Sequence, residues 1–492
     1  MKLGILLDFD KILDKSEDID TEREVVPARK NEECNEDSLL FILKPAMKEE
    51  NGFINLNTKA YAVVTDRPQL IRTNAKIISV ENAREAYAHS LSNFYSIDYS
   101  RIKIIGVTGT NGKTTTATLI YEILLRCGRK AGFIGTGKIE INRQKITDSF
   151  YSMTTPDPEE LYPAILEMVK ADCEFIVMEV SSHALSLGKV APITFELGLF
   201  TNLTEEHLDY HKNMEDYFLA KMLLFKNCKR GIFNIDDFFG ARGFTLASCE
   251  KISVGIINPA EVYATEIDCK NPGGITYFYR RGDHIFRVKS SLIGCYNVYN
   301  TLLALCAVIM LGVKPCAAKR ALTEIKGIPG RMEKTEGDVT VVIDYAHTPF
   351  AFENLLKTLK SIQNPRQKLH VVFGCGGERD REKRSLIGTV VTSFADFTYV
   401  TEDNSRGEDF LSILSDIERG MPKSKKHRVI EKRDEAIFTA ILNASPGDTV
   451  AIIGKGQEEY IIDKNGKRPF FEKEIILSAL KARGGRSYEN NS

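Results

Sequence analysis

The chain has 492 residues, of which 43% are apolar and 27% charged, and its 66 basic and 67 acidic residues leave a net charge of −1. This balance gives no global electrostatic attraction to nucleic acid or to an anionic membrane, so we expect neither as a partner. The length predicts about three domains, and the longest apolar run, TLLALCAVIMLGV, is too short to cross a bilayer.

The N-terminal segment is interrupted by acidic residues and lacks the apolar core of a signal peptide. The ten cysteines form no C-x-x-C pair, and several lie in apolar contexts such as LALCAV. We therefore expect a cytoplasmic protein whose cysteines are reduced thiols, without a zinc site built on cysteine.

Residues 1 to about 100 carry the short apolar runs SLLFIL, AYAVVT and AKIISV and predict a small α/β domain. From Arg101 the β-rich run RIKIIGVTG ends in glycine, and KTTTATLIYEILLRCG has helical periodicity with Gly128 as a stop signal. The near-continuous apolar runs AGFIGT, EFIVMEVSS and FELGLFTNLT are typical of strands in a mostly parallel sheet that is covered on both faces.

Residues 261–294 change character, since alternating strands are separated by the turn signals NPGG and RRGD. They predict an antiparallel insertion, followed by a helix from Asn297 to about Leu311. After the junction KGIPGRME, the runs TVVIDYA, KLHVVFG, ADFTYVT, HRVIE and DTVAIIG predict a second open sheet of Rossmann-like layout. The predicted fold is α/β with domains at 1–100, 101–328 and 329–492.

The segment GVTGTNGKTTT lies between a predicted buried strand and a helix N-terminus, where backbone N–H groups and the helix dipole favour anions. The strict phosphate-loop pattern needs glycine at Val107, so this loop is a variant, and a glycine-rich turn without a ligand is the alternative. The G-K-T-T ending favours nucleotide phosphates. We expect them at Gly109, Thr110, Asn111, Gly112, Lys113, Thr114 and Thr115.

Two further positions suggest a metal near this loop. Glu179 ends a predicted strand, where a carboxylate faces the usual ligand crevice and suits Mg²⁺. His207 and His211 have helical spacing, but no thiol or carboxylate nearby completes a zinc site. A role for one of the two histidines as an Mg²⁺ ligand requires fewer residues than a zinc site. Lys221, on a predicted helix in YFLAKMLLFKN, is either a solvated surface charge or part of a site.

The motifs GVTGTNGKTTT, TTPDP, MEVSSHAL, TNLTEEHLDYH, YFLAKMLLF, GCYNVYN, GIPGRME, VIDYAHTP and GCGGERDREKR occur in the order found in the Mur ligases, and the chain most closely resembles the MurE type. The resemblance covers about 101–471. It implies a monomer with a UDP-sugar-binding, an ATP-binding and an amino-acid-binding domain, which adds the third residue of the peptidoglycan stem peptide through an acyl phosphate.

The resemblance also implies roles for individual residues. Lys113, Glu179, His207 and Lys221 would be catalytic, with Lys221 carbamylated by CO₂ and with Thr114, Glu179, His207 and Lys221 serving Mg²⁺. Nucleotide contacts would come from Asn297, Asn300, Arg331, Asp344 and His347. Contacts to the UDP-N-acetylmuramoyl-dipeptide would come from Thr154, Thr155, Ser181, Lys221 and Lys189, which stands where an arginine is common.

The segment TEDNSRGED resembles the D-N-P-R motif of members that add meso-diaminopimelate, with Ser405 in place of proline. The resemblance assigns the amino-acid pocket to Arg384, Asp403, Asn404, Arg406, Gly454 and Glu458. A guanidinium at Arg406 favours the distal carboxylate of diaminopimelate over the ammonium of L-lysine. Serine in place of proline makes the loop less stiff, so L-lysine stays an alternative substrate.

The sequence departs from the family pattern at PAR, where the family has D-S-R, and at Gln457 and Phe350. These departures keep two further functions open. One is that of a related ligase that acts on a different carboxylate substrate. The other is that of a non-catalytic ATP-binding regulatory protein, against which the complete set of ATP-site residues argues.

Overall fold

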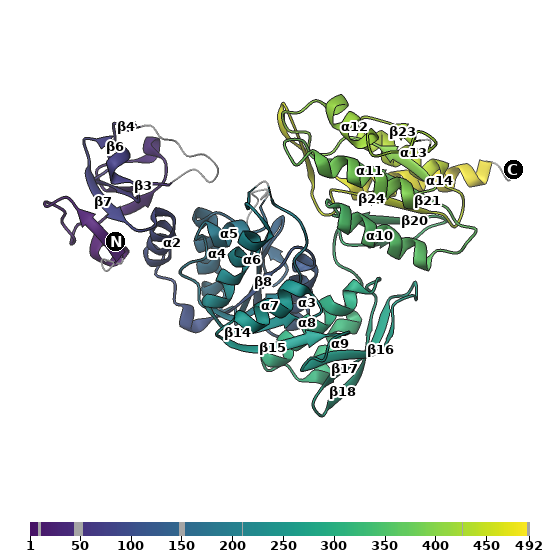
Figure 1. Cartoon of the computed structure of the whole chain (residues 1–492), viewed down its shortest axis with the longest axis horizontal. Helices are drawn as coiled ribbons and strands as arrows, with labels where there is room; N and C mark the ends of the chain where they lie inside the picture. Colours follow the sequence, from purple (N-terminus) through teal and green to yellow (C-terminus); the bar gives the residue numbers. More distant parts are fainter. Residues whose placement is uncertain (8–10, 44–52, 147–152, 209, 426, 490–492) are drawn as a thin grey trace. The chain divides into compact units, whose positions relative to one another are not determined.

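A computed structural model describes residues 1–7, 11–43, 53–146, 153–208, 210–425 and 427–489, and Figure 1 shows α/β architecture along the whole chain. The predicted fold class is confirmed. The described chain forms two compact units, residues 1–262 with 303–318 and residues 263–302 with 319–492, and each is described by itself. The domain boundaries near residues 100 and 328 stay predictions.

The N-terminal residues form a small sheet, as the three apolar runs predict. Its strand order is β1-β7-β5-β3-β2, with only the β1–β7 pair antiparallel. Helix α2 begins after Asn82, whose side chain accepts hydrogen bonds from two backbone N–H groups of the first turn. The elements are α1 (Leu3–Leu6), β1 (Ile12–Lys15), β2 (Val26–Ala28), β3 (Ser38–Ile42), β4 (Ile54–Leu56), β5 (Ala62–Thr65), β6 (Ile71–Thr73), β7 (Lys76–Val80) and α2 (Ala83–Phe94).

The predicted central sheet has six parallel strands in the order β9-β12-β8-β13-β14-β15, with β10 and β11 antiparallel beyond β9. Strands β9 and β12 are entirely buried, which explains their continuous apolar sequences. The elements are β8 (Lys103–Thr108), α3 (Lys113–Arg126), β9 (Ala131–Gly135), β10 (Lys138–Ile141), β11 (Gln144–Lys145), α4 (Pro158–Lys170), β12 (Phe175–Glu179), α5 (Ser182–Ser186), β13 (Phe195–Phe200), α6 (Met214–Lys226), β14 (Cys228–Asn234), α7 (Phe238–Leu246) and β15 (Glu250–Gly255).

The predicted antiparallel insertion is confirmed as the meander β16-β17-β18. The predicted helix after it is α8, within one residue at each end. The elements are β16 (Val262–Asp268), β17 (Ile275–Arg281), β18 (His284–Ser290), α8 (Tyr296–Met310) and α9 (Pro315–Glu324).

The C-terminal sheet has the order β19-β20-β24-β21-β22-β23, and all its pairs except β19–β20 are parallel. One apolar core lies between the sheet and α10, α11 and α12, and a second lies between the sheet and α13 and α14, so helices cover both faces (Figure 1). The elements are β19 (Glu333–Thr335), β20 (Thr340–Asp344), α10 (Pro349–Ile362), β21 (Leu369–Phe373), α11 (Glu382–Phe394), β22 (Phe397–Val400), α12 (Phe410–Glu418), β23 (His427–Val429), α13 (Arg433–Asn443), β24 (Thr449–Ile453), β25 (Tyr460–Asp463), β26 (Gly466–Pro469) and α14 (Glu472–Glu489).

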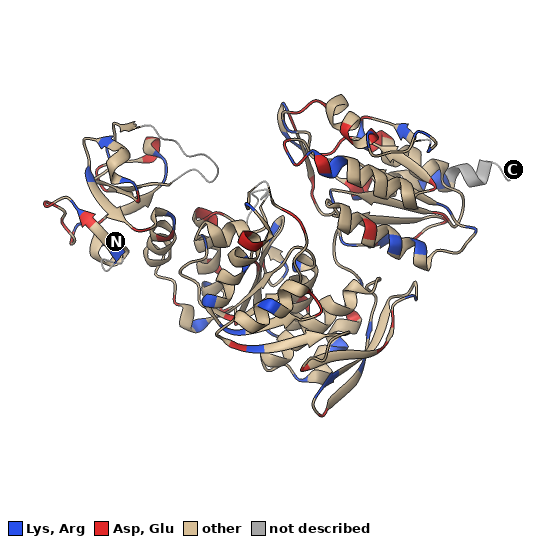
Figure 2. Ribbon diagram, in the orientation of Figure 1, with Lys and Arg blue, Asp and Glu red and all other residues tan. Residues whose placement is uncertain are grey.

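Charges of both signs are interspersed over the ribbon, in keeping with the balanced composition (Figure 2). Within the described ranges, none of the helices combines the length and the apolar character that a membrane span requires.

Candidate active site

The predicted phosphate loop joins the carboxyl end of β8 to the first residue of α3. Gly109 has φ +144° and Gly112 has φ +83°, conformations that L side chains rarely adopt. A Cβ on Gly109 would lie 1.9 Å from the Thr201 hydroxyl. The Asn202 side chain accepts a hydrogen bond from the Asn111 backbone N–H at 2.9 Å. Glycine and the neighbouring strand end therefore fix the loop.

Two lysines from different helices converge on this loop. The ammonium of Lys113 donates to the carbonyls of Gly109 at 2.9 Å and Thr110 at 2.8 Å. The ammonium of Lys221, on α6, donates to the same Gly109 carbonyl at 2.8 Å, and its side chain is buried. Burial and the charge of Lys113 lower the pKa of Lys221 well below its ordinary value, although Glu206 opposes them. Lys221 is therefore not a solvated surface charge.

The carboxylate of Glu179 is fully buried at the end of β12. It accepts hydrogen bonds from the Thr114 hydroxyl at 2.8 Å and from the Thr136 backbone N–H at 2.9 Å. Thr136 did not emerge from the sequence reasoning. The feature of the sequence that could have identified Thr136 is its position directly after β9. Strand β9 pairs with β12, so the carboxyl ends of both parallel strands lie at the same edge of the sheet. Thr114 and Glu179 together present hard oxygen atoms at the loop.

His207 lies beside this cluster with φ +57°, and its ring packs edge-on against His183 at 5.0 Å between centroids. Burial lowers the pKa of His207 to about 3, and the Glu206 carboxylate only partly opposes this, so the imidazole is neutral. His211 is buried and lies 3.0 Å from the Ser182 hydroxyl, which makes it a structural residue. The described residues contain no group of three or more His, Cys, Asp or Glu side chains that could hold a metal.

Three residues predicted to contact the muramoyl substrate lie next to Glu179. The Thr155 hydroxyl donates to the Glu179 carbonyl at 2.9 Å and accepts from the Ser181 backbone N–H at 3.0 Å. The Ser181 hydroxyl caps α5 by accepting from a backbone N–H in its first turn. Thr154 accepts from the Thr136 hydroxyl at 3.3 Å. These side chains border the sheet edge at which Glu179 lies, and Ser181 also has the capping role that its sequence context suggests.

Lys189 is buried and forms an ion pair with Asp157 at 2.8 Å. Asp157 also lies 3.8 Å from Arg29, which hydrogen bonds to Glu159 at 3.0 Å. Arg29 comes from the PAR segment that departs from the family pattern. The structure thus places that segment beside the start of α4, together with Lys189.

The residues predicted on the nucleotide side lie in the second unit. Asn297 and Asn300 are buried on the first turns of α8 and are hydrogen bonded to each other at 2.8 Å. The guanidinium of Arg331 lies 4.5 Å from the centre of the Tyr345 ring. Asp344 accepts two backbone N–H groups, and burial raises its pKa despite their effect. His347, also after β20, is exposed.

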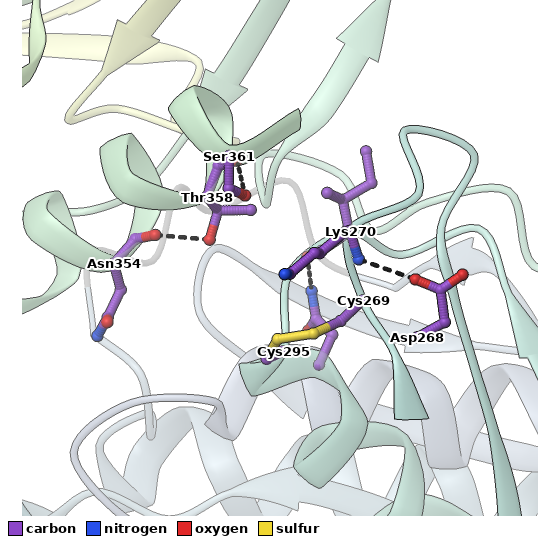
Figure 3. Close-up of a disulfide and its surroundings, with 9 residues drawn as sticks. Asp268, Cys269, Lys270, Cys295, Asn354, Thr358 and Ser361 are labelled. Carbon is purple, nitrogen blue, oxygen red and sulfur yellow. Dashed lines mark hydrogen bonds between the residues drawn. A yellow bond between two sulfur atoms is a disulfide. The ribbon is translucent and has the colours of Figure 1, made fainter. Parts of the chain in front are cut away.

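The prediction that all cysteines are reduced thiols is wrong for one pair. Cys269, directly after β16, and Cys295, directly before α8, form a disulfide (Figure 3). The sequence contains no signal for this bond, because the two residues are 26 positions apart and only the folding of the meander brings them together. The other eight cysteines are free.

The residues predicted for the amino-acid pocket in TEDNSRGED, together with Gly454 and Glu458, gather at the carboxyl edge of the C-terminal sheet. The Asn404 side chain donates to Glu458 at 2.8 Å, and the Asn404 backbone N–H donates to the Asp403 carboxylate at 2.6 Å. Gly454, with φ +123°, follows β24, and a Cβ there would lie 2.5 Å from Asp403. Lys455, which the sequence reasoning did not name, is buried among these groups.

Arg406 has φ +55°, and its guanidinium donates to the carbonyls of Gly377 at 2.7 Å and Asn404 at 3.1 Å. Its backbone N–H donates to the Ile462 carbonyl at 3.0 Å, and the Ile462 N–H donates to the Asn404 side chain at the same distance. These bonds to β25 hold the loop around Ser405, so proline is not needed to stiffen it.

The pocket role of Arg384 stays a prediction, and the structure shows which groups its guanidinium binds. Its side chain is buried and donates to both oxygens of Glu408, at 2.8 and 2.7 Å, and to Asp416 at 3.1 Å. It also donates to the Gly376 carbonyl at 3.1 Å. Arg406 and Arg379 both lie within 4 Å of a Cβ built on that same glycine, and their charges interact. The segment GGERDREKR indicates that an arginine lies near the pocket, but the sequence does not show which of its arginines faces the pocket.

The profiles of the Mur ligase middle domain and the Mur ligase glutamate ligase domain match residues 107–308 and 330–456. The chain is 38% identical over 456 residues to UDP-N-acetylmuramoyl-L-alanyl-D-glutamate--2,6-diaminopimelate ligase 1 of Clostridium acetobutylicum, covering 91% of this chain and 92% of that protein. It is 40% identical over 461 residues to the ligase of that name from Nostoc sp., with coverage of 90% and 92%. A solved structure of a 2,6-diaminopimelate ligase matches with TM-score 0.65 and 27% identity, covering 95% of this chain and 97% of that one.

Proposed function

Since the chain belongs to the Mur ligase family, we propose that it joins meso-2,6-diaminopimelate to UDP-N-acetylmuramoyl-L-alanyl-D-glutamate in an ATP-dependent, ADP-forming reaction of peptidoglycan synthesis. The observation that carries the proposal is the convergence of the Lys113 ammonium and the buried Lys221 amine on the Gly109 carbonyl, near the buried Glu179 carboxylate. Such a cluster suits a phosphate chain with a bound cation. The names of the relatives identify the carboxylate substrate and the amine substrate that we propose for this chain.

A carboxylate and an amine do not condense in water without activation. Transfer of the γ-phosphoryl group to the D-glutamyl carboxylate forms an acyl phosphate and releases ADP. The amine of the amino acid then attacks the acyl carbon, and the collapse of the tetrahedral intermediate expels phosphate. The ammonium of Lys113 reduces the repulsion between the two anions in the first step and stabilises the charge that develops on the phosphoryl oxygens.

The residues around the loop fit a divalent cation of hard character. The hydroxyl of Thr114 and the carboxylate of Glu179 are the oxygen ligands that Mg²⁺ accepts alongside phosphate oxygens. Bound Mg²⁺ would neutralise phosphate charge during phosphoryl transfer. The neutral imidazole of His207 could serve a second ion.

Lys221 fits such a site only after modification, because an ammonium repels a cation. Its uncharged amine can add to CO₂ with loss of a proton, which yields a carbamate with two oxygen donors. The geometry supports this proposal, since Lys221 is buried against the phosphate loop with its Nζ 2.8 Å from the Gly109 carbonyl.

The amino-acid pocket supports diaminopimelate over L-lysine. Arg406 and Arg379 supply guanidinium groups near the loop after β21, and Glu458 supplies a carboxylate. The distal carboxylate of diaminopimelate can pair with the guanidinium groups, and its distal ammonium can pair with Glu458. The ammonium of L-lysine would instead lie near two guanidinium groups. We propose that the N-terminal domain binds the UDP portion, with Arg29 near the dipeptide end, and that the enzyme acts as a cytoplasmic monomer.

One assay tests the proposal. Purified protein receives ATP, Mg²⁺ and UDP-N-acetylmuramoyl-L-Ala-D-Glu with a panel of amino acids, and phosphate release is followed. Release with meso-diaminopimelate and not with L-lysine is the expected result. Release with L-lysine alone would reverse the assigned specificity. Turnover only with another carboxylate substrate would make the chain a specialised ligase, and ATP binding without any turnover would indicate a regulatory protein.

A further inference from the structure

Lys455 is a fully buried lysine whose charge the proposed chemistry does not use. It follows Gly454 at the carboxyl end of β24. Its ammonium donates to the Asn404 side-chain oxygen at 3.0 Å and to Glu458 Oε2 at 3.2 Å, and it lies 3.5 Å from Asp403 Oδ1. An ammonium has three N–H groups, and three acceptors surround this one.

All three acceptors belong to the proposed amino-acid pocket, and they come from two separate loops. Asp403 and Asn404 follow β22, whereas Glu458 lies in the loop after β24. Lys455 therefore joins the two loops, and the hydrogen bond from the Asn404 side chain to Glu458 Oε2 joins them a second time. Glu458 Oε2 accepts hydrogen bonds from both of these donors, so its contacts are made within the protein.

The other oxygen of Glu458 has a different environment. It accepts from the Tyr345 hydroxyl at a longer 3.4 Å, and the Tyr460 hydroxyl also hydrogen bonds to the Glu458 carboxylate. A substrate ammonium could therefore approach Oε1, while Oε2 anchors the carboxylate. The orientation of Glu458 depends on the two donors at Oε2, and Lys455 is the charged one.

The charges around Lys455 make its loss costly for the pocket in particular. Burial acts to raise the pKa of Asp403, yet the charges of Lys455 and Arg433 hold that pKa below its ordinary value. Arg433 is itself hydrogen bonded to Glu472 at 2.6 Å. Without Lys455, the buried carboxylate of Asp403 and the half-buried carboxylate of Glu458 would remain in the pocket with much weaker compensation of their charges.

We propose that Lys455 is a positioning residue that orients Glu458 and the loop at Asp403 to receive the distal ammonium of the incoming amino acid. It acts through Glu458 and does not touch the substrate. This inference rests on the proposed function, because it takes the pocket to be the amino-acid site.

The test replaces Lys455 by methionine in the full chain, which keeps the apolar stem and removes the ammonium. The KM for meso-diaminopimelate should rise roughly 30-fold or more, while the KM values for ATP and the nucleotide-dipeptide stay within about twofold of the parent. Lys464→Met, at an exposed lysine between β25 and β26, is the matched control and should leave all three KM values unchanged.

A double-mutant cycle separates positioning from general stability. If Lys455 acts through Glu458, Lys455→Met should change the KM for diaminopimelate much less in a Glu458→Gln background than in the parent. If Lys455→Met alone fails to fold, Glu458→Gln is compared directly with the double variant, which lacks both the ammonium and the half-buried carboxylate. A further rise of roughly 30-fold in the KM for diaminopimelate between these two would then overturn the inference.

Two results would overturn the inference: an unchanged KM for diaminopimelate in folded Lys455→Met, or equal effects of Lys455→Met in both backgrounds. If the parent itself does not use diaminopimelate, the proposed function fails instead. The parent assay therefore distinguishes the two failures.

Discussion

Replacing Arg384 by methionine tests whether this arginine binds substrate or supports the pocket from inside. Its guanidinium is bonded to Glu408 and Asp416, and its side chain is buried. Removal of one partner from a buried ion pair costs about 3–5 kcal/mol when the remaining charge is uncompensated. Here both acids keep other partners, since Arg381 lies 3.3 Å from Glu408 and 3.0 Å from Asp416, and Arg419 lies 2.5 Å from Asp416.

Because these partners remain, we expect a smaller loss, about 2–3 kcal/mol. For a domain of this size that corresponds to a decrease of about 4–12 °C in the midpoint of its thermal transition. Differential scanning calorimetry is the suitable measurement, because it can separate the transitions of a chain with several domains. Arg366→Met, at an exposed arginine, should leave the midpoint unchanged and serves as the control.

The same ion pair predicts how this loss depends on pH. The hydrogen bond from Arg384 is the largest influence that lowers the pKa of Glu408, from 4.5 to about 2. A carboxylate with a depressed folded-state pKa contributes stability that is fully present above its unfolded pKa and is lost as the pH falls through the folded pKa. The difference in stability between the parent and Arg384→Met should therefore shrink between pH 4.5 and about 2.

A kinetic comparison with Arg406→Met distinguishes a substrate-binding role of Arg384 from a supporting role. Arg406 donates to carbonyl oxygens only, so its loss should leave the thermal midpoint nearly unchanged and raise the KM for diaminopimelate roughly 10- to 100-fold. A parental midpoint for Arg384→Met together with this same selective increase in KM would show that Arg384 binds the substrate and does not support the pocket from inside.

Three further predictions concern the loop and the disulfide. Gly109→Ala, whose Cβ would lie 1.9 Å from the Thr201 hydroxyl, should reduce kcat/KM for ATP roughly 100-fold in a phosphate-release assay, and parental kinetics would contradict the strained loop. Lys221→Ala should lower kcat roughly 100- to 1,000-fold, and full activity would remove Lys221 from the site. Thiol titration of the denatured, unreduced chain should count eight thiols, against ten after reduction of Cys269–Cys295; ten in both samples would exclude the disulfide.

The sequence predicts local elements well wherever the hydrophobic pattern and the position in the sheet agree. Each run that predicts a strand, from RIKIIGVTG to DTVAIIG, contains a strand, and the most continuous apolar runs form strands buried on both faces. The longest apolar run, TLLALCAVIMLGV, belongs instead mostly to helix α8. The contact of Lys221 with the phosphate loop is harder to predict. Periodicity places Lys221 on a helix, but only the family match distinguishes it from an exposed charge.

The residues that the sequence reasoning missed have their roles set by partners distant in the chain. Thr136 reaches Glu179 because β9 and β12 are neighbours, and Cys269 reaches Cys295 because the meander folds back. The periodicity of a single sequence carries no information on such pairings. A motif match has a related weakness, because it identifies a segment without the direction in which each side chain points.

Arg384 and Lys455 show the consequence for a pocket. Both lie in segments that match the family, and both are buried cations whose hydrogen bonds go to protein acceptors rather than outward. A buried charge needs such partners, since unpaired it would cost several kcal/mol. The same partners make it a support for the side chains that remain exposed to substrate. A charge in a matching motif therefore indicates a pocket, and the degree of burial distinguishes Arg384 and Lys455, which are buried, from the half-buried Arg406.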